Sequence, residues 1–167
     1  MLMDLAGVLA VFDRQPRLVA LGRLCGLAPG EVAARVYSSG FVEAADSGEF
    51  DADGVRAGIS GRLGLRCAPE EVDAAWMAAF EEDPAALAVM DAARPPAVVA
   101  LFSNNDALVG SLVGQYLPGV AARCDAIVFA GYSAYANPLN RPTPVRCKHW
   151  ESRRSAACSS TTTRTQR

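Results

Sequence analysis

The chain begins with Met1-Leu2-Met3-Asp4-Leu5-Ala6-Gly7-Val8-Leu9, an apolar run that ends in one carboxylate and continues through a small-residue turn. Apolar residues followed by a Gly-containing turn are typical of a buried strand that stops in a tight loop. Asp4 would then stand at the carboxyl end of that strand, where open α/β sheets place their functional groups. The alternative is a strand end with a solvated aspartate, and the rest of the chain must separate the two.

A second strand end has a similar character. The apolar run Ala97–Phe102 leads into Ser103-Asn104-Asn105-Asp106, and a helical pattern follows from Ala107. Such a run is typical of a central parallel strand, and neighbouring parallel strands bring their carboxyl ends to one edge of the sheet. We therefore expect Asp4 to lie beside Ser103 and Asn104. A hydroxyl and a helix amino terminus can hold a phosphoryl group next to a carboxylate nucleophile. The alternative is that Ser103 or Asn104 only caps the helix.

The interval between the two runs predicts helices. Leu18, Leu21 and Leu24 recur at helical spacing. Further helix starts are predicted at Pro29, Asp51, Pro69 and Pro84. Residues 38–48 are predicted to form a loop, and Ala126–Ala130 another buried strand. The order is strand, four or five helices, strand, helix, strand. It predicts an α/β fold, a Rossmann-like parallel sheet core with an α-helical cap inserted after the first strand.

The domain organisation follows from this order. We assign residues 1–13 and 84–140 to the α/β core, residues 14–83 to the helical cap, and residues 141–167 to a basic disordered tail. Residues 1–140 contain 9 basic and 17 acidic side chains, whereas residues 141–167 contain 7 basic and 1 acidic. A basic tail can be a nucleic-acid-binding arm, which is one interpretation of this asymmetry.

Composition limits the class of protein. Hydrophobic residues make up 51% and charged residues 20% of the 167 residues, which is typical of a globular domain. The apolar runs are too short to span a bilayer, and we see no secretory signal. The five cysteines form no C-x-x-C pair, and His149 is the only histidine, so no His-pair metal site is expected. We expect a cytoplasmic protein with no membrane partner; the oligomeric state is not predicted.

The ordered set of motifs resembles one known family. Asp4–Leu9 resembles the first motif of haloacid dehalogenase-like (HAD) hydrolases, and Val98–Asn105 resembles their second motif. The residues between them, including Ser39-Gly40-Phe41 and Ser47-Gly48-Glu49-Phe50, resemble the small helical cap of the phosphatase-like branch. The resemblance covers about residues 1–133.

This resemblance implies a Mg²⁺-dependent phosphatase of small phosphorylated metabolites. Asp4 would attack phosphorus and form an aspartyl-phosphate, while Ser103 and Asn104 would bind the phosphoryl group. Mg²⁺ would be held by Asp4 and by the backbone carbonyl of Ala6. Many phosphatases of the family have an Asp as general acid–base where this chain has Ala6, so the proton donor is unassigned.

The family pattern stops after Tyr132. No lysine stands in the place of the third motif, and no acidic pair follows the third strand. We interpret residues 141–167 as an out-of-frame translation. The shifted frame combines the last base of each codon with the first two bases of the next codon. In that frame Trp150-Glu151 must encode a Gly, and Cys158–Thr163 can encode Phe-Val-Asp-Asp-Asn, which restores an acidic pair. The core would then be incomplete at its C-terminus, phosphatase activity impaired, and the basic tail no evidence of a nucleic-acid partner. The nucleotide sequence of these codons tests this interpretation.

Two other functions remain open from the sequence. A 2-haloacid dehalogenase-like hydrolase would release halide without a metal, although the aromatic residue that those enzymes carry two positions after the nucleophile is absent here. A non-catalytic interaction protein with a basic tail would show salt-sensitive nucleic-acid binding that deletion of residues 141–167 removes.

Overall fold

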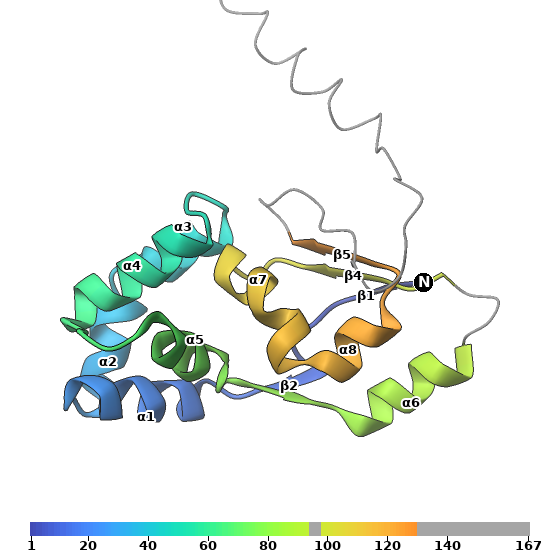
Figure 1. Ribbon diagram of the computed structural model, residues 1–167, viewed down its shortest axis with the longest axis horizontal. Coiled ribbons are helices and arrows are strands. Elements are labelled where there is room, and N and C mark those ends of the chain that lie inside the picture. The colour runs from blue at the N-terminus through green and yellow to red at the C-terminus, as the bar shows by residue number, and fades with distance from the viewer. Residues whose placement is uncertain (94–97, 130–167) are drawn as a thin grey trace, which may run out of the picture.

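The computed structural model describes residues 1–93 and 98–129 of the chain, and the predicted tail of residues 141–167 lies outside them. The described elements are, in order, β1 (Leu2–Met3), β2 (Ala10–Phe12), α1 (Arg14–Cys25), α2 (Pro29–Val36), α3 (Phe41–Asp46), α4 (Ala52–Leu63), α5 (Pro69–Met77), β3 (Phe80–Glu82), α6 (Pro84–Ala93), β4 (Ala100–Ser103), α7 (Ala107–Tyr116), α8 (Pro118–Arg123) and β5 (Ala126–Phe129). Figure 1 shows α1–α5 gathered at one end of the molecule and strands β1, β4 and β5 at the other.

The parallel sheet has the order β1-β4-β5, which confirms the predicted α/β fold with helices inserted after the first strand. In its register Met3 pairs with Leu101, and Ser103 pairs with Phe129. Helices α7 and α8 connect β4 to β5 and lie along one side of the sheet (Figure 1). The approach of α7 is close, because a Cβ added at Gly110 would lie 3.0 Å from the Phe129 ring.

A short antiparallel pair of strands flanks the helical segment α1–α5, with β2 before the segment in sequence and β3 after it. Strands β2 and β3 pair with Ala10 opposite Glu82 and Phe12 opposite Phe80. The Asp13 N–H also donates to the carbonyl of Ala79 across 2.9 Å. These strands were not predicted from the sequence, because three residues are too few to display an alternating pattern. The chain therefore leaves and re-enters the core at adjacent points.

Helix ends in this segment follow local chemistry. The Asp13 carboxylate accepts from the Gln15 N–H at the start of α1, and Gly26 ends that helix with φ at 72°. Helix α3 corrects the prediction of a loop over residues 38–48. It is only six residues long, so its periodicity is weak in sequence. Phe41 of α3 is buried and packs on α4, where a Cβ at Gly58 would lie 2.4 Å from the ring.

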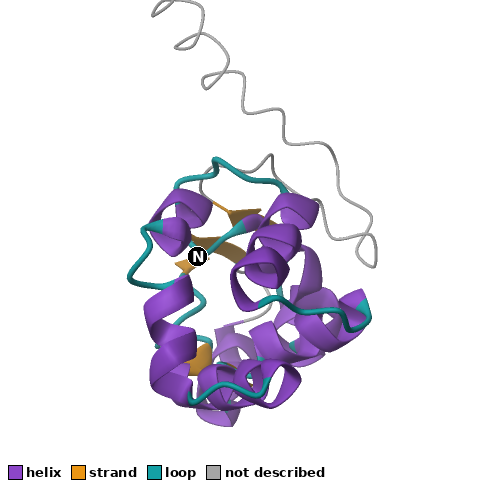
Figure 2. Ribbon diagram, turned by 90° about the vertical axis from the view of Figure 1, so that its left-hand side faces the viewer, coloured by secondary structure: helices purple, strands orange, loops and turns teal. Residues whose placement is uncertain are grey.

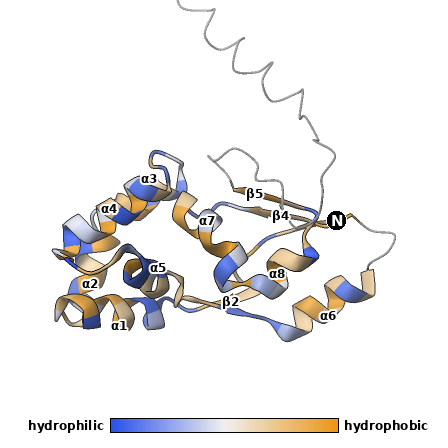
Figure 3. Cartoon of the chain, viewed as in Figure 1, coloured by the Kyte–Doolittle hydropathy of each residue, from blue (hydrophilic) through white to orange (hydrophobic). Residues whose placement is uncertain are grey.

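Most of the described chain is helical, and the strands are short (Figure 2). The hydropathy colouring shows apolar residues along α7, which lies between the sheet and the helical segment (Figure 3). Trp76, Leu101 and Leu108 are fully buried, so one core runs through the helical segment, α7 and the sheet. Among residues 1–93 and 98–129, no helix combines the length and hydropathy that a membrane span requires.

Candidate active site

Asp4 follows β1 at the carboxyl edge of the parallel sheet. The register of β1 against β4 places the residues after Met3 beside the residues after Leu101. Asp4 is exposed, and one of its carboxylate oxygens, Oδ1, accepts from the Leu5 N–H across 2.7 Å. The second carboxylate oxygen accepts no hydrogen bond from the described residues. Asp4 therefore presents an oxygen to solvent at the sheet edge.

The turn after Asp4 is wound around one carbonyl. The Leu5 carbonyl accepts from the N–H groups of Val8, Leu9 and Ala10 at 3.4, 3.0 and 2.9 Å. Gly7 has φ at 74°, a conformation that other residues rarely adopt. Its N–H donates to the Ala10 carbonyl across 2.8 Å. This compact turn explains the small-residue pattern in the sequence, and it directs the chain from β1 into β2.

The second strand end is held by its own side chains. Ser103 is 1% exposed, and its Oγ accepts from Asn105 Nδ2 across 2.7 Å. Asp106, rather than Ser103 or Asn104, caps α7, since its Oδ1 accepts from the Val109 N–H across 2.9 Å. The cap alternative considered for Ser103 and Asn104 is therefore wrong. Asn104 is exposed and remains available for the anion-binding position that precedes a helix, whereas Ser103 is buried there.

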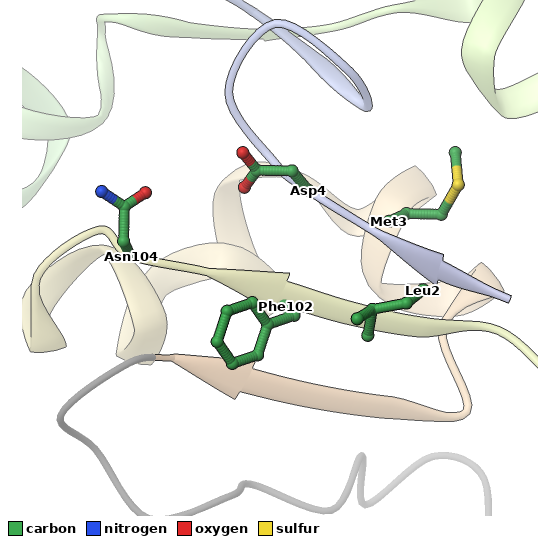
Figure 4. Close-up of a pocket in the computed structure, with 5 residues that line it drawn as sticks. All are labelled: Leu2, Met3, Asp4, Phe102 and Asn104. Atoms are coloured by element: carbon green, nitrogen blue, oxygen red, sulfur yellow. The ribbon is translucent and has the colours of Figure 1, made fainter.

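A cavity of about 360 Å³ lies where β1 and β4 end. It is lined by Leu2, Met3, Asp4, Phe102 and Asn104. Figure 4 shows the Asp4 carboxylate and the Asn104 amide projecting on the same side, beyond the ends of the two strands. Ser103 does not line this cavity, because its side chain is buried. The structure thus brings together Asp4 and Asn104, with Ser103 directly behind Asn104.

Few of the described residues at this site could bind a metal ion. Asp4 offers a carboxylate, and the Ala6 carbonyl accepts no hydrogen bond from the described residues. In residues 1–93 and 98–129, no cluster of three His, Cys, Asp or Glu side chains could hold a metal ion. Mg²⁺ commonly uses only one or two carboxylates together with phosphate oxygens and water. These two oxygens fit such an ion, but only as a weak site.

A polar cluster behind the site, formed by the buried Arg17, Trp76 and Asp106 and the half-buried Asp46, was not predicted from the sequence. Burial raises the pKa of Asp106, against the stabilising hydrogen bonds from Val109 and Trp76 and the charge of Arg17. Burial, followed by the charge of Asp106, raises the pKa of Asp46 to about 6. An available signal was Arg17 on the apolar side of a helix, one residue before Leu18. An arginine within a leucine pattern needs a buried partner.

Comparisons with known proteins identify the fold. No protein-family model matches the chain, and no curated protein sequence matches it. Among solved structures, a HAD family enzyme from Bacteroides thetaiotaomicron superposes with a TM-score of 0.60 at 19% identity, covering 94% of this chain and 77% of that one. The same enzyme in complex with magnesium and inorganic phosphate gives a TM-score of 0.57 at 16% identity, over 94% of this chain and 77% of that one.

A third structure agrees with these two. A predicted HAD-like family hydrolase from Porphyromonas gingivalis gives a TM-score of 0.59 at 19% identity, covering 93% of this chain and 75% of that one. This chain therefore has the fold of the HAD family enzymes.

Proposed function

We propose that this protein is a HAD-type hydrolase whose cavity at Asp4 and Asn104 binds the phosphoryl group of a small phosphorylated metabolite. The observation that supports the proposal most directly is the shared cavity. An exposed carboxylate and an amide from two neighbouring parallel strands line it, and the start of α7 lies just beyond. The neighbour solved with magnesium and inorganic phosphate supports the same ligand chemistry.

The chemistry assigned to the chain is a phosphoryl transfer through Asp4. An Asp4 carboxylate oxygen attacks phosphorus, and the bond from phosphorus to the ester oxygen of the substrate breaks. The leaving alkoxide takes a proton from water, since Ala6 has no group to donate one. Water then attacks phosphorus in the aspartyl-phosphate, which releases inorganic phosphate and restores the carboxylate.

Other residues of the chain hold the phosphoryl group during this transfer. Asn104 donates its amide to a phosphoryl oxygen, and the Ser103 hydroxyl, fixed by Asn105, orients the loop that carries it. Mg²⁺ bound by Asp4 and the Ala6 carbonyl would supply positive charge to the transferred phosphoryl group. The sequence offers no lysine or acidic pair in the usual family places, so we expect turnover to be slow.

The experiment that tests this proposal is trapping of the aspartyl-phosphate. The purified chain is incubated with Mg²⁺ and acetyl phosphate, a small activated donor, and the phosphorylated peptide is located by mass spectrometry. We expect phosphate on Asp4 and none in Asp4→Asn. Asp13→Asn is the matched control, because Asp13 is an exposed carboxylate that caps α1 and an asparagine preserves that cap.

Three results would contradict the proposal. The first is equal labelling of the wild-type chain and Asp4→Asn, and the second is labelling only at another carboxylate. The third is metal-independent halide release from a 2-haloacid by wild type but not by Asp4→Asn, which would identify the dehalogenase-like alternative.

A further inference from the structure

A chain of buried polar contacts connects the helical segment to the start of α7. The Arg17 Nε on α1 donates to the Trp76 carbonyl on α5 across 2.6 Å, and its guanidinium carbon lies 3.9 Å from the centre of the Trp76 ring. The Trp76 Nε1 then donates to Asp106 Oδ2 across 3.0 Å. These three side chains are 4%, 0% and 3% exposed. Arg17 and Trp76 belong to the helical segment, whereas Asp106 belongs to the core.

Asp106 connects these contacts to the candidate site. Its Oδ2 accepts from Trp76, and its Oδ1 caps α7 by accepting from the Val109 N–H across 2.9 Å. Asn104, which lines the cavity, stands two residues earlier in the same loop. One carboxylate therefore fixes both the first turn of α7 and the position of α5 relative to it.

Two further elements of the helical segment approach the same point. Asp46, the last residue of α3, lies near enough to Asp106 and Arg17 for their charges to shift its pKa. Arg17 Nη1 donates to the Tyr37 hydroxyl at the end of α2 across 3.0 Å. Arg17 Nη2 is buried and has no hydrogen-bond partner among the described residues. Helices α1, α2, α3 and α5 thus all contact this polar cluster.

Such a cluster is more specific than an apolar contact. Leucine-like packing would hold α5 against α7 over a range of small displacements, whereas hydrogen bonds fix both distance and direction. A buried polar group that loses its partner is disfavoured, so the hydrogen bonds that Arg17, Trp76 and Asp106 do make favour the observed arrangement. That arrangement fixes the position of the loop of residues 103–106 relative to the helical segment.

We propose that Trp76 and Asp106 are positioning residues, whose hydrogen bond sets the Ser103–Asn105 loop for phosphate and couples phosphate binding to the packing of the helical segment on α7. Neither residue touches the phosphate. By linkage, phosphate bound at the loop stabilises the Trp76–Asp106 contact as much as the contact favours phosphate. The part of this inference that concerns phosphate rests on the proposed function.

The experiment compares variants that differ in one hydrogen bond. Trp76→Phe retains an aromatic ring beneath Arg17 but removes the indole donor. Asp106→Asn retains an oxygen for the Val109 N–H and changes the group that faces the indole. The matched control is Asp73→Asn on the same helix α5, because Asp73 is also buried and pairs with Arg56 inside the helical segment, at 2.7 Å.

Inorganic phosphate is titrated in the presence of Mg²⁺ and followed by ¹H–¹⁵N spectra of full-length protein. In wild type we expect the amides of Asn104 and Asn105 and the indole of Trp76 to shift together with one dissociation constant. Trp76→Phe and Asp106→Asn should weaken phosphate binding about 5- to 10-fold, the size of one typical intramolecular hydrogen bond. Asp73→Asn should stay within about twofold of wild type, even where it lowers thermal stability.

The outcomes separate the inference from the proposed function. Folded Trp76→Phe that binds phosphate like wild type overturns the coupling, and so does an equal loss in Asp73→Asn. If wild type binds no phosphate, the proposed function fails while the positioning role is still tested. Amide exchange at Asn104 and Asn105 should then be at least severalfold faster in Trp76→Phe and Asp106→Asn than in Asp73→Asn. Unchanged exchange would overturn that role as well.

Discussion

Asp4 and Asn104 line one cavity, although they lie 100 positions apart in the sequence. Two neighbouring parallel strands bring them together, and each residue directly follows its strand. The arrangement places a negative charge next to an amide at the edge of the sheet. Anion binding at this edge therefore depends on whether a cation accompanies the anion.

We expect Asp4→Asn to change phosphate binding in opposite directions with and without Mg²⁺. Without the metal, the Asp4 carboxylate repels phosphate, so its neutralisation should strengthen binding severalfold. With Mg²⁺, wild type should bind phosphate more tightly, and Asp4→Asn should lose that increase because it removes the only side-chain carboxylate of the proposed site. Calorimetric titration with Mg²⁺ or with EDTA measures both effects. A Mg²⁺ response that Asp4→Asn leaves intact would place the metal elsewhere.

Ser103→Ala tests the buried residue behind the cavity. The change removes the oxygen that accepts from Asn105 Nδ2 and leaves a half-buried amide without that partner. A lost hydrogen bond of this kind is worth about 1 kcal/mol, so we expect phosphate affinity to fall about fivefold. Ser103→Thr, which keeps the hydroxyl, is the comparison for phosphate titrations followed at Asn105. Equal affinities for Ser103→Ala and wild type would show that this hydroxyl does not organise the loop.

Two glycines of α4 should respond oppositely to the same substitution. A Cβ at Gly58 would lie 2.4 Å from the ring of Phe41, over which Arg62 also stacks, whereas nothing lies within 4 Å of a Cβ at Gly61. Gly58→Ala should destabilise by about 1–3 kcal/mol through overpacking, despite its better helix propensity. Gly61→Ala should stabilise by about 0.5–1 kcal/mol. Urea unfolding measures both, and stabilisation by Gly58→Ala would mean that α3 packs differently.

Asp46 should make stability depend on pH. Its pKa rises on folding from 3.8 to about 6, through burial and then the charge of Asp106. The folded protein therefore binds more protons between these values, so the free energy of unfolding falls as pH rises from about 4 to about 6 and then levels off. Because Asp46 is only half-buried, solvent screening limits the effect to about 1 kcal/mol.

The measurement for Asp46 is a comparison with Asp46→Asn. Urea unfolding of both chains between pH 4 and 7.5 should show a smaller fall in stability for the variant over that interval. The charge of Arg17 lowers the pKa of Asp46 and that of Glu43 raises it. Neither residue is substituted, so that the two chains differ only at Asp46. A curve for Asp46→Asn that parallels wild type would show that this carboxyl does not take up the proton.

The sheet and the long helices were predictable because each leaves a strong local pattern. An apolar run before Asp4 and another before Ser103 identify two strands, and parallel pairing then predicts their common edge. The leucines of α1 and the proline at the start of α5 mark helices in the same local way. The short strands β2 and β3 leave no such pattern, since their pairing depends on residues about 70 positions apart.

The buried cluster was unpredictable for a different reason. Trp76 lies on an apolar helix face, and that pattern correctly predicts burial, but it does not show which group meets the indole nitrogen. Asp106 resembles an ordinary helix cap in sequence, and it is one. That its second oxygen reaches Trp76 follows only from the packing of α5 against α7. Contacts between helices distant in sequence therefore determine the part of the site that local patterns omit.

The pairing of β2 with β3 determines where the helical segment of this protein could be exchanged. Since Phe12 pairs with Phe80, the chain enters and leaves the helical segment through this one pair of strands, and the segment also packs on α7. Replacing the helical segment by a shorter or longer one would leave the distance between β2 and β3 unchanged. A foreign helical segment could therefore be transplanted here to redirect ligand choice, provided that it supplies a hydrogen-bond donor for Asp106 in place of the Trp76 indole.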